Sequence, residues 1–222
     1  MADYTWSYSA LSTFQQCPRK YHRLKVVKDV KEPVSTTILY GQELHKAAEE
    51  YVKNGKEIPE KFMFMKQFID VFLTIDGERL CEHRMGLTKE LTPCEFFAKD
   101  VWLRSVADLL ILSGDTAYLI DYKTGKSQYA DTKQLELMSL CVFQHFPQIK
   151  LVKGGLLFVV SQEFIESEYT PEGQKEAWMS WFDELIRLEG CYESGTWNPS
   201  PNFTCKKFCP VEDCEYHGNN GR

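Results

Sequence analysis

No stretch of this sequence is apolar over enough residues to cross a membrane. The most apolar run, GGLLFVV at residues 154–160, falls far short of the roughly 20 residues that a spanning helix needs. The opening MADYTWSYSA contains no apolar run, so we predict no secretory signal. Internal repeats and low-complexity segments are missing as well. We therefore expect a protein of the cytoplasm with no membrane partner.

An excess of positive charge is also missing, because the 222 residues carry a formal net charge of −6. This balance argues against a surface coated with basic residues for nucleic acid. Hydrophobic residues make up 43% of the chain and aromatic residues 14%. That content is typical of a globular protein, and the length fits one domain with a real core.

One short region departs from the acidic average. Between Pro18 and Lys31 the only acidic residue is Asp29, and the basic residues are Arg19, Lys20, Arg23, Lys25, Lys28 and Lys31. Such a basic strip, with Tyr21 inside it, could bind a polyanion. On charge alone a solvated helix face is the preferred interpretation.

The hydrophobic periodicity predicts helices and strands that alternate along the chain. Helical patterns cover residues 9–24, 36–54, 60–74, 131–146 and 171–193, and strand patterns cover 79–87, 95–112, 117–123 and 151–161. Asp131 and Gln134 resemble a capping box at the start of the fourth helix. Strands in the middle with helices before, between and after them indicate an α/β fold around a mixed sheet.

The segment ILSGDTAYLIDYKTG predicts a β-hairpin with Gly114 and Asp115 as its two-residue loop. In that register paired positions sum to 229, so Asp108 falls opposite Asp121. Lys123 shares the face of Asp121, since side chains alternate along a strand. The hairpin therefore places two carboxylates and one ammonium group together.

Two ionised carboxylates at cross-strand distance repel each other when they are removed from water. A divalent cation such as Mg²⁺ removes that repulsion, because it prefers carboxylate oxygens as ligands. The alternative is an Asp–Lys ion pair beside a solvated Asp on an exposed strand, but the apolar neighbours favour burial. The segment KTGKS does not form a nucleotide-binding P-loop, because Ile120 stands where that motif needs glycine.

Asp108 followed by DYK at residues 121–123 resembles the PD-(D/E)XK nuclease superfamily, and more narrowly its RecB-like branch of CRISPR-associated and phage exonucleases. SYSALSTFQQCPRKYHRLKV is similar to the N-terminal signature of that branch. YGQELHKAAEEY resembles its Gly-x-x-x-His helix, with Gly41 and His45, and Gln134 matches its glutamine motif. Two positions depart from the pattern: Met138 stands where tyrosine is common, and no glycine precedes Asp108.

The resemblance implies a restriction-endonuclease-like core and a metal-dependent phosphodiester hydrolase. In it Asp108, Asp121, His45 and the backbone carbonyl of Tyr122 would bind Mg²⁺ or Mn²⁺. The further catalytic residues that it implies are Lys123, which positions the attacking water, Gln134 near the scissile bond, and Glu82 as an assisting acid.

Four cysteines near the two ends of the chain form a second candidate site. The resemblance implies that Cys17, Cys205, Cys209 and Cys214 bind a [4Fe–4S] cluster, although Cys209 is shifted by one residue from the usual spacing. Thiolates suit such clusters or zinc, so Zn²⁺ with His217 and free thiols remain alternatives. We expect one nuclease domain over residues 1–222, in which residues 1–35 and 197–222 form a cysteine-linked terminal subregion with a stapled tail. The other cysteines, Cys81, Cys94, Cys141 and Cys191, are expected to be packing residues.

We therefore predict a metal-dependent DNA exonuclease that acts on ends or single strands during recombination, repair or phage DNA processing, in a bacterial or phage-infected cytoplasm. The residues of the basic strip predicted to follow the DNA are Arg19, Lys20, Tyr21, Arg23 and Lys25. The alternatives are an endonuclease of the same superfamily and a non-catalytic nucleic-acid-binding module. An oligomer or a recombination-protein partner is left open.

Overall fold

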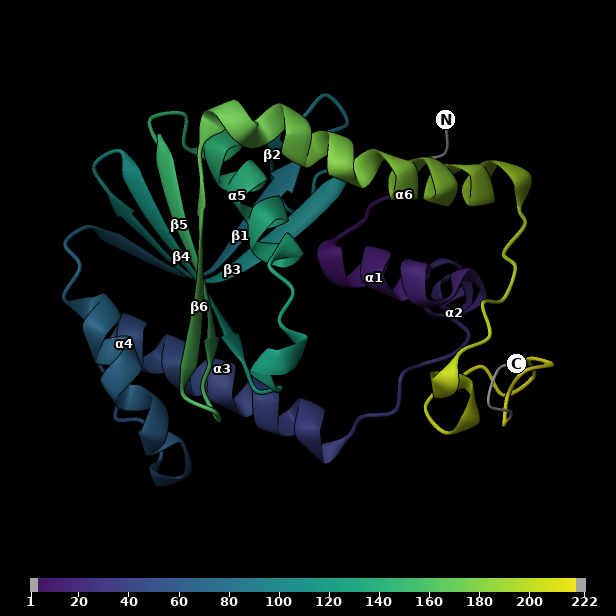
Figure 1. The fold of residues 1–222 in the computed structure, drawn as a ribbon, viewed down its shortest axis with the longest axis horizontal. Coiled ribbons are helices and arrows are strands. Elements are labelled where there is room, and N and C mark those ends of the chain that lie inside the picture. Colours follow the sequence, from purple (N-terminus) through teal and green to yellow (C-terminus); the bar gives the residue numbers. More distant parts are fainter. Residues whose placement is uncertain (1–3, 219–222) are drawn as a thin grey trace. The chain divides into compact units, whose positions relative to one another are not determined.

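The computed structural model describes residues 4–218, and Figure 1 shows the ribbon. The chain divides into two compact units. Residues 36–178 form the first, which we call the sheet unit, and residues 1–35 with 179–222 form the second, the terminal unit. Helix α6 (Gln174–Ser194) contributes residues to both. Within residues 4–218, no helix combines the length and apolar character that a bilayer crossing requires.

The sheet unit contains a six-stranded mixed sheet in the order β2-β1-β3-β4-β5-β6 (Figure 1). The strands are β1 (Glu78–Leu87), β2 (Pro93–Cys94), β3 (Leu103–Ser113), β4 (Thr116–Lys123), β5 (Leu151–Phe158) and β6 (Glu163–Tyr169). All neighbours are antiparallel except β4 and β5, which are parallel. Parallel neighbours need a long crossover, and it contains η3 (Ser127–Tyr129) and α5 (Lys133–His145). The predicted mixed α/β fold is confirmed.

Two adjacent glycines in β5 show which helix covers which face of the sheet. A Cβ atom added to Gly154 would lie 3.3 Å from Cδ1 of Leu135 in α5. A Cβ atom added to Gly155 would overlap the ring of Phe164, which packs against Phe72 of α4 (Lys66–Leu73). Because successive strand residues face opposite sides, α5 and α4 cover opposite faces. Gly155 needs to be glycine because the Phe164 ring occupies the space of a Cβ, whereas a Cβ at Gly154 would only be tightly packed.

The face opposite α5 packs on α3 (Thr36–Asn54), η2 (Glu60–Met65) and α4. The residues that carry this core are fully or almost fully buried, and they include Leu44, Ile69, Leu109, Ile111 and Leu157. Burying one such side chain contributes about 1.5–3 kcal/mol relative to exposing it. Burial of Leu44 therefore holds α3 against the sheet and orients the next residue of that helix, His45.

The terminal unit contains α1 (Tyr8–Gln16), α2 (Pro18–Tyr21), the π-helix η1 (His22–Val27), residues 179–194 of α6 and η5 (Phe203–Lys206). Its core is aromatic. The buried ring of Tyr21 packs edge-on against Phe14 and stacks on Trp197, with centroids 5.6 and 5.8 Å apart. Its hydroxyl lies 3.1 Å from that of Tyr192.

Several predicted elements differ from the structure. The expected helix 9–24 is interrupted at Cys17, whose backbone is extended (φ −165°, ψ 112°), because a residue before proline disfavours the helical region. The expected strand 95–112 begins only at residue 103. The strand β6 was not predicted, since no strand or helix was assigned to residues 163–169. Another helix, α5, starts without the expected capping box, because its N-cap is Thr132, which makes no side-chain cap.

Candidate active site

Acidic residues occupy corresponding positions on neighbouring strands at the centre of the sheet. The pairs on both sides of Glu82 and Asp108 join β1 to β3, but these two residues are not paired themselves. Glu82 has φ 49°, in the left-handed region that non-glycine residues rarely adopt. Such backbone strain is typical of functional sites. The break in the ladder therefore coincides with two candidate catalytic acids.

The hairpin register predicted from the sequence is confirmed at five pairs of β3 and β4, the last of which joins Leu109 to Ile120. The expected backbone pair of Asp108 with Asp121 is not formed, because the ladder ends one position earlier. Instead, Oδ2 of Asp108 accepts a hydrogen bond from the backbone N–H of Tyr122 at 2.8 Å. The Asp108 carboxylate thus replaces the backbone partner that Tyr122 would have if the ladder continued.

Helix α3 positions His45 beside Asp108. Its Nδ1 lies 3.2 Å from Oδ1 of Asp108, and the ring meets Tyr122 edge-on. Ligand atoms of His45, Glu82 and Asp108 all lie within 4.8 Å of one another. An imidazole and two carboxylates in such proximity form a donor set that suits a divalent cation such as Mn²⁺.

Asp121 belongs to an adjoining polar cluster. Its side chain is buried, and Oδ1 accepts a hydrogen bond from Nε2 of Gln134 at 2.8 Å. The Lys123 ammonium group lies 2.7 Å from Oδ2 of Asp121 and donates to Oε1 of Gln134 at 2.6 Å. Oδ2 makes only this ion pair and accepts no hydrogen bond from residues 4–218. A buried carboxylate oxygen with that unused capacity can serve as a metal ligand.

The pKa values in the cluster show an excess of negative charge. Burial and then the charge of Asp108 raise the pKa of Asp121, although Lys123 opposes them. Burial and the charge of Asp108 also raise the pKa of Glu82. Burial by itself lowers the pKa of His45, but the hydrogen bond to Asp108 and the nearby carboxylates outweigh it and raise that pKa. Each shift reflects a site that a cation would stabilise.

A groove of about 730 Å³ opens beside these residues, between α3 and β1. His45 and Glu82 line it together with two exposed cationic residues, Lys46 and Arg84. The sequence reasoning missed both cations. Arg84 could have been identified from the sequence. It lies two residues after Glu82 in the same strand, so the two residues share one side of the sheet.

In the terminal unit, Cys17, Cys205, Cys209 and Cys214 line one small pocket, together with His217. All four are free thiols. The backbone N–H groups of Ser200 and Asn202 donate to the sulfurs of Cys17 and Cys205, each at 3.4 Å. Burial raises the pKa of the Cys209 side chain, so it is a neutral thiol unless a bound cation stabilises the thiolate.

Among residues 4–218, no three of these thiols and His217 have ligand atoms within 4.8 Å of one another. This geometry does not choose between a [4Fe–4S] cluster and Zn²⁺.

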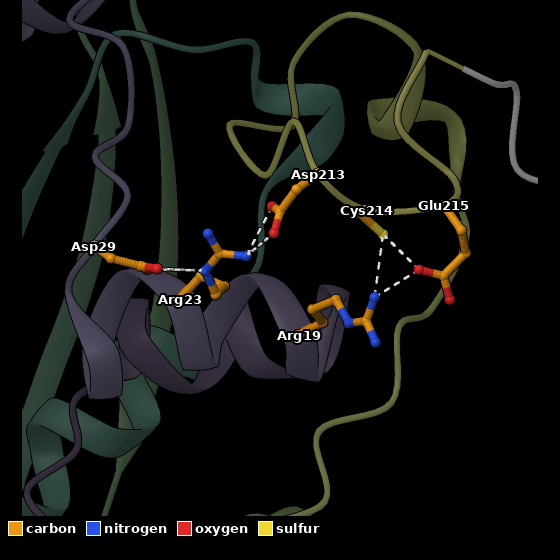
Figure 2. A network of polar contacts seen from close by, with 6 residues as sticks. All are labelled: Arg19, Arg23, Asp29, Asp213, Cys214 and Glu215. Carbon is orange, nitrogen blue, oxygen red and sulfur yellow. Dashed lines mark hydrogen bonds and ion pairs between the residues drawn. The ribbon is translucent and has the colours of Figure 1, made fainter.

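Two arginines of the basic strip, Arg19 and Arg23, pair with acids of the terminal unit (Figure 2). Arg19 pairs with Glu215 at 2.6 Å, and Nη1 of Arg19 also lies 4.0 Å from the sulfur of Cys214. Arg23 pairs with Asp29 and Asp213 at 2.8 and 2.7 Å. These contacts join the N-terminal helices to the C-terminal tail.

The other three residues of the predicted DNA-contact set differ in their surroundings. Lys20 pairs with Glu32 at 2.9 Å. Tyr21 is only 1% exposed, so in this arrangement its side chain faces the interior and not a nucleic acid. Lys25 is exposed, and it is the member of the predicted contact set best placed to meet a polyanion.

Comparison with known proteins bears on the fold and the family of the chain. The chain is similar to a solved structure from Eubacterium rectale that is provisionally described as an exonuclease, with a TM-score of 0.52 and 14% identity over 95% of this chain and 86% of that one. A second structure, SSO0001, gives a TM-score of 0.41 and 12% identity over 98% and 89% of the two chains, too low to support an argument. A search of the curated proteins finds no match. The family model of the PD-(D/E)XK nuclease superfamily matches residues 5–216. The chain therefore belongs to the PD-(D/E)XK nuclease superfamily.

Proposed function

We propose that this protein is a divalent-metal-dependent DNA exonuclease. The observation that carries the proposal is the cluster of His45, Glu82 and Asp108 within 4.8 Å, beside the Asp121–Lys123 ion pair of 2.7 Å. Half-buried acids that repel one another, next to a buried acid and one lysine, cost stability. This is the arrangement expected where a cation and a phosphate are to be bound.

The residues that would hold Mg²⁺ or Mn²⁺ are Asp108, Asp121, His45 and the carbonyl of Tyr122. When bound, such a cation lowers the pKa of a water ligand and offsets charge on the phosphate. His45 is suited to the role because its Nδ1 already faces Oδ1 of Asp108 at 3.2 Å. Asp121 is suited because its Oδ2 accepts no hydrogen bond from the described residues.

Lys123 and Gln134 would orient the reacting groups. The amide of Gln134 donates to Asp121 and accepts from Lys123. This one side chain therefore positions both the Asp121 carboxylate and the Lys123 ammonium group. The Lys123 ammonium can then donate to an attacking water or to a phosphate oxygen. Glu82, whose ligand atom lies within 4.8 Å of those of His45 and Asp108, would be the acid that assists at the cation site.

Digestion of linear and circular DNA tests the exonuclease against the endonuclease of the same superfamily. The exonuclease is favoured because a similar structure carries that provisional description. We expect Mg²⁺-dependent release of nucleotides from linear DNA and none from covalently closed circles. Cleavage of circles would assign an endonuclease. DNA binding without metal uptake or cleavage would assign a non-catalytic module.

We also propose that Cys17, Cys205, Cys209 and Cys214 bind a [4Fe–4S] cluster, with Zn²⁺ and His217 as the alternative. Support comes from the single pocket that the four thiols share. Iron, sulfide and zinc should be measured in anaerobically purified protein. Cys17→Ser should remove the iron and its visible absorption, while Cys191→Ser, a matched change outside the pocket, should retain both.

A further inference from the structure

An exposed aromatic pair lies next to the catalytic groove, in the loop between β2 and β3. Phe97 is 70% exposed, and Phe96 is half-buried. Their rings meet edge-on, with centroids 5.0 Å apart and planes at 85°. A large ring left this open to water contributes little to the core, so folding does not account for Phe97.

Two arginines from neighbouring strands surround the pair. The Arg84 guanidinium carbon lies 5.5 and 5.6 Å from the ring centroids of Phe96 and Phe97. The corresponding distances for Arg104 are both 5.3 Å, and its Nε donates to the carbonyl of Phe96 at 2.7 Å. Within residues 4–218, Arg84 forms no ion pair. Two cations that share the same two rings repel each other, so this group is not optimised for stability.

Arg84 connects the aromatic pair to the catalytic acids. It lines the groove together with Glu82 and His45, and its charge acts on Glu82. A chain of contacts therefore runs from the predicted metal ligands through Arg84 to the exposed face of Phe97. Any polymer bound along this path meets acids first, then a cation, then a flat apolar surface.

We infer that Phe97 is a stacking platform for an unpaired base of single-stranded DNA, and that Arg84 binds the phosphate between that base and the scissile bond. The inference deepens the proposed nuclease function and rests on it. Stacking of a base on an aromatic side chain contributes about 1–3 kcal/mol and tolerates any sequence. Paired bases in a duplex stack on each other, so the site would select single-stranded ends.

The chemistry favours a nucleic acid over a protein partner. A docking patch for an apolar peptide would not need two guanidinium groups beside its central ring, because their desolvation costs free energy. A polyanion with flat bases uses both features at once: the guanidinium groups for its phosphates and the ring for its bases.

Fluorescence anisotropy in EDTA, where metal-dependent cleavage is stopped, tests the inference on the full chain. The probes are a labelled oligothymidine and a blunt duplex of the same length. Phe97→Leu keeps an apolar side chain but removes the flat ring, and should weaken single-strand binding at least about fivefold. Phe97→Trp should retain the single-strand affinity. Arg84→Gln should weaken single-strand binding about as much as Phe97→Leu does. Phe182→Leu, at another exposed phenylalanine, should have no effect.

Duplex binding should change less than twofold in all four variants, and their thermal unfolding should match the wild type because the side chains are exposed. Unchanged single-strand affinity in Phe97→Leu, or an equal loss on duplex, would overturn the platform. A separate cleavage assay with Mg²⁺ distinguishes a failure of the Phe97 platform from a failure of the proposed nuclease activity. Loss of single-strand affinity in Phe97→Leu with no cleavage by wild type would sustain the platform and reject the nuclease activity.

Discussion

The carboxylate of Asp108 accepts the backbone N–H of Tyr122 at 2.8 Å, across the point where the β3–β4 ladder ends. This bond anchors the acid to the strand that carries Asp121 and Lys123. An amide oxygen can accept the same bond, so Asp108→Asn removes the charge and keeps the anchor.

Asp108→Asn should therefore lose metal binding but keep the fold. We expect its Mn²⁺ affinity, measured by isothermal titration calorimetry, to fall by at least about 100-fold, since even residues behind a ligand cost 10–100-fold. Its unfolding temperature in EDTA should stay equal to or above that of the wild type, because one of the repelling charges is gone. Glu168→Gln, on the exposed strand β6, is the control. Retained Mn²⁺ affinity in Asp108→Asn would remove this residue from the site.

Lys123→Ala should lower the cleavage rate by about 10²- to 10³-fold, as removal of one positioned donor does elsewhere. It also leaves the buried Asp121 carboxylate without its ion pair. The variant should thus be less stable than the wild type in EDTA and recover in Mn²⁺. Lys153→Ala, which breaks an exposed pair with Glu168, should change neither property. Cleavage at the wild-type rate by Lys123→Ala would contradict the assigned role.

In the metal-free protein, the Asp121 carboxyl should contribute more to stability as the pH falls from about 6 to about 4. Burial and the charge of Asp108 raise the pKa of Asp121 from 3.8 to about 6, so in this range its folded form binds a proton more tightly than its unfolded form. The raised pKa of Glu82 acts in the same direction, whereas carboxyls whose pKa is lowered by ion pairs, such as Asp70 and Asp213, act in the opposite direction. The Asp121 contribution is therefore measured as the difference between the thermal unfolding of the wild type and of Asp121→Asn in EDTA.

In Asp121→Asn this contribution should be missing, so its stability relative to the wild type should decrease on acidification from pH 6 to pH 4. Saturating Mn²⁺ should remove the difference in slope, since protons compete with the cation for the carboxylates. Unfolding temperatures of the metal-free wild type and Asp121→Asn that change in parallel over this range would show that Asp121 does not take up a proton there.

Glu82 should contribute to the chemistry of the site while its backbone conformation lowers the stability of the protein. Its φ of 49° disfavours any side chain by about 1–2 kcal/mol. Glu82→Gly should therefore be more stable than Glu82→Ala by about 1 kcal/mol, while both lose Mn²⁺ affinity. Gln162→Gly, at an exposed position with φ 58°, should gain stability and keep the affinity. Equal stability of the glycine and alanine variants at residue 82 would indicate that this backbone is unstrained.

The hairpin was predictable because local rules determine it. A two-residue loop at Gly114 sets the register, and the alternation of side chains then brings Asp121 and Lys123 together. The break in the ladder at Asp108 was not predictable, because it depends on a side chain that replaces a backbone partner. The strained conformation of Glu82 has no local signal either, since nothing in the sequence around it demands a positive φ.

Gln134 shows how one pattern can support two interpretations. Its spacing from Asp131 resembles a capping box, but its amide contacts Asp121 and Lys123 instead. The choice between these roles depends on where the crossover after β4 places the helix, which is a tertiary effect. The platform at Phe97 was missed for a similar reason, because residues 95–102 resembled a strand and form a loop.

The most direct test of the account is the Mg²⁺-dependent degradation of end-labelled linear DNA by purified wild-type protein and by Asp121→Asn. Asp121 is buried and ion-paired with Lys123, and an asparagine fits the same space without the charge that a cation needs. We expect the wild type to release nucleotides only when Mg²⁺ or Mn²⁺ is present, and the folded variant to release none. Degradation by Asp121→Asn at the wild-type rate would contradict the central claim that these acids hold the metal that cleaves DNA.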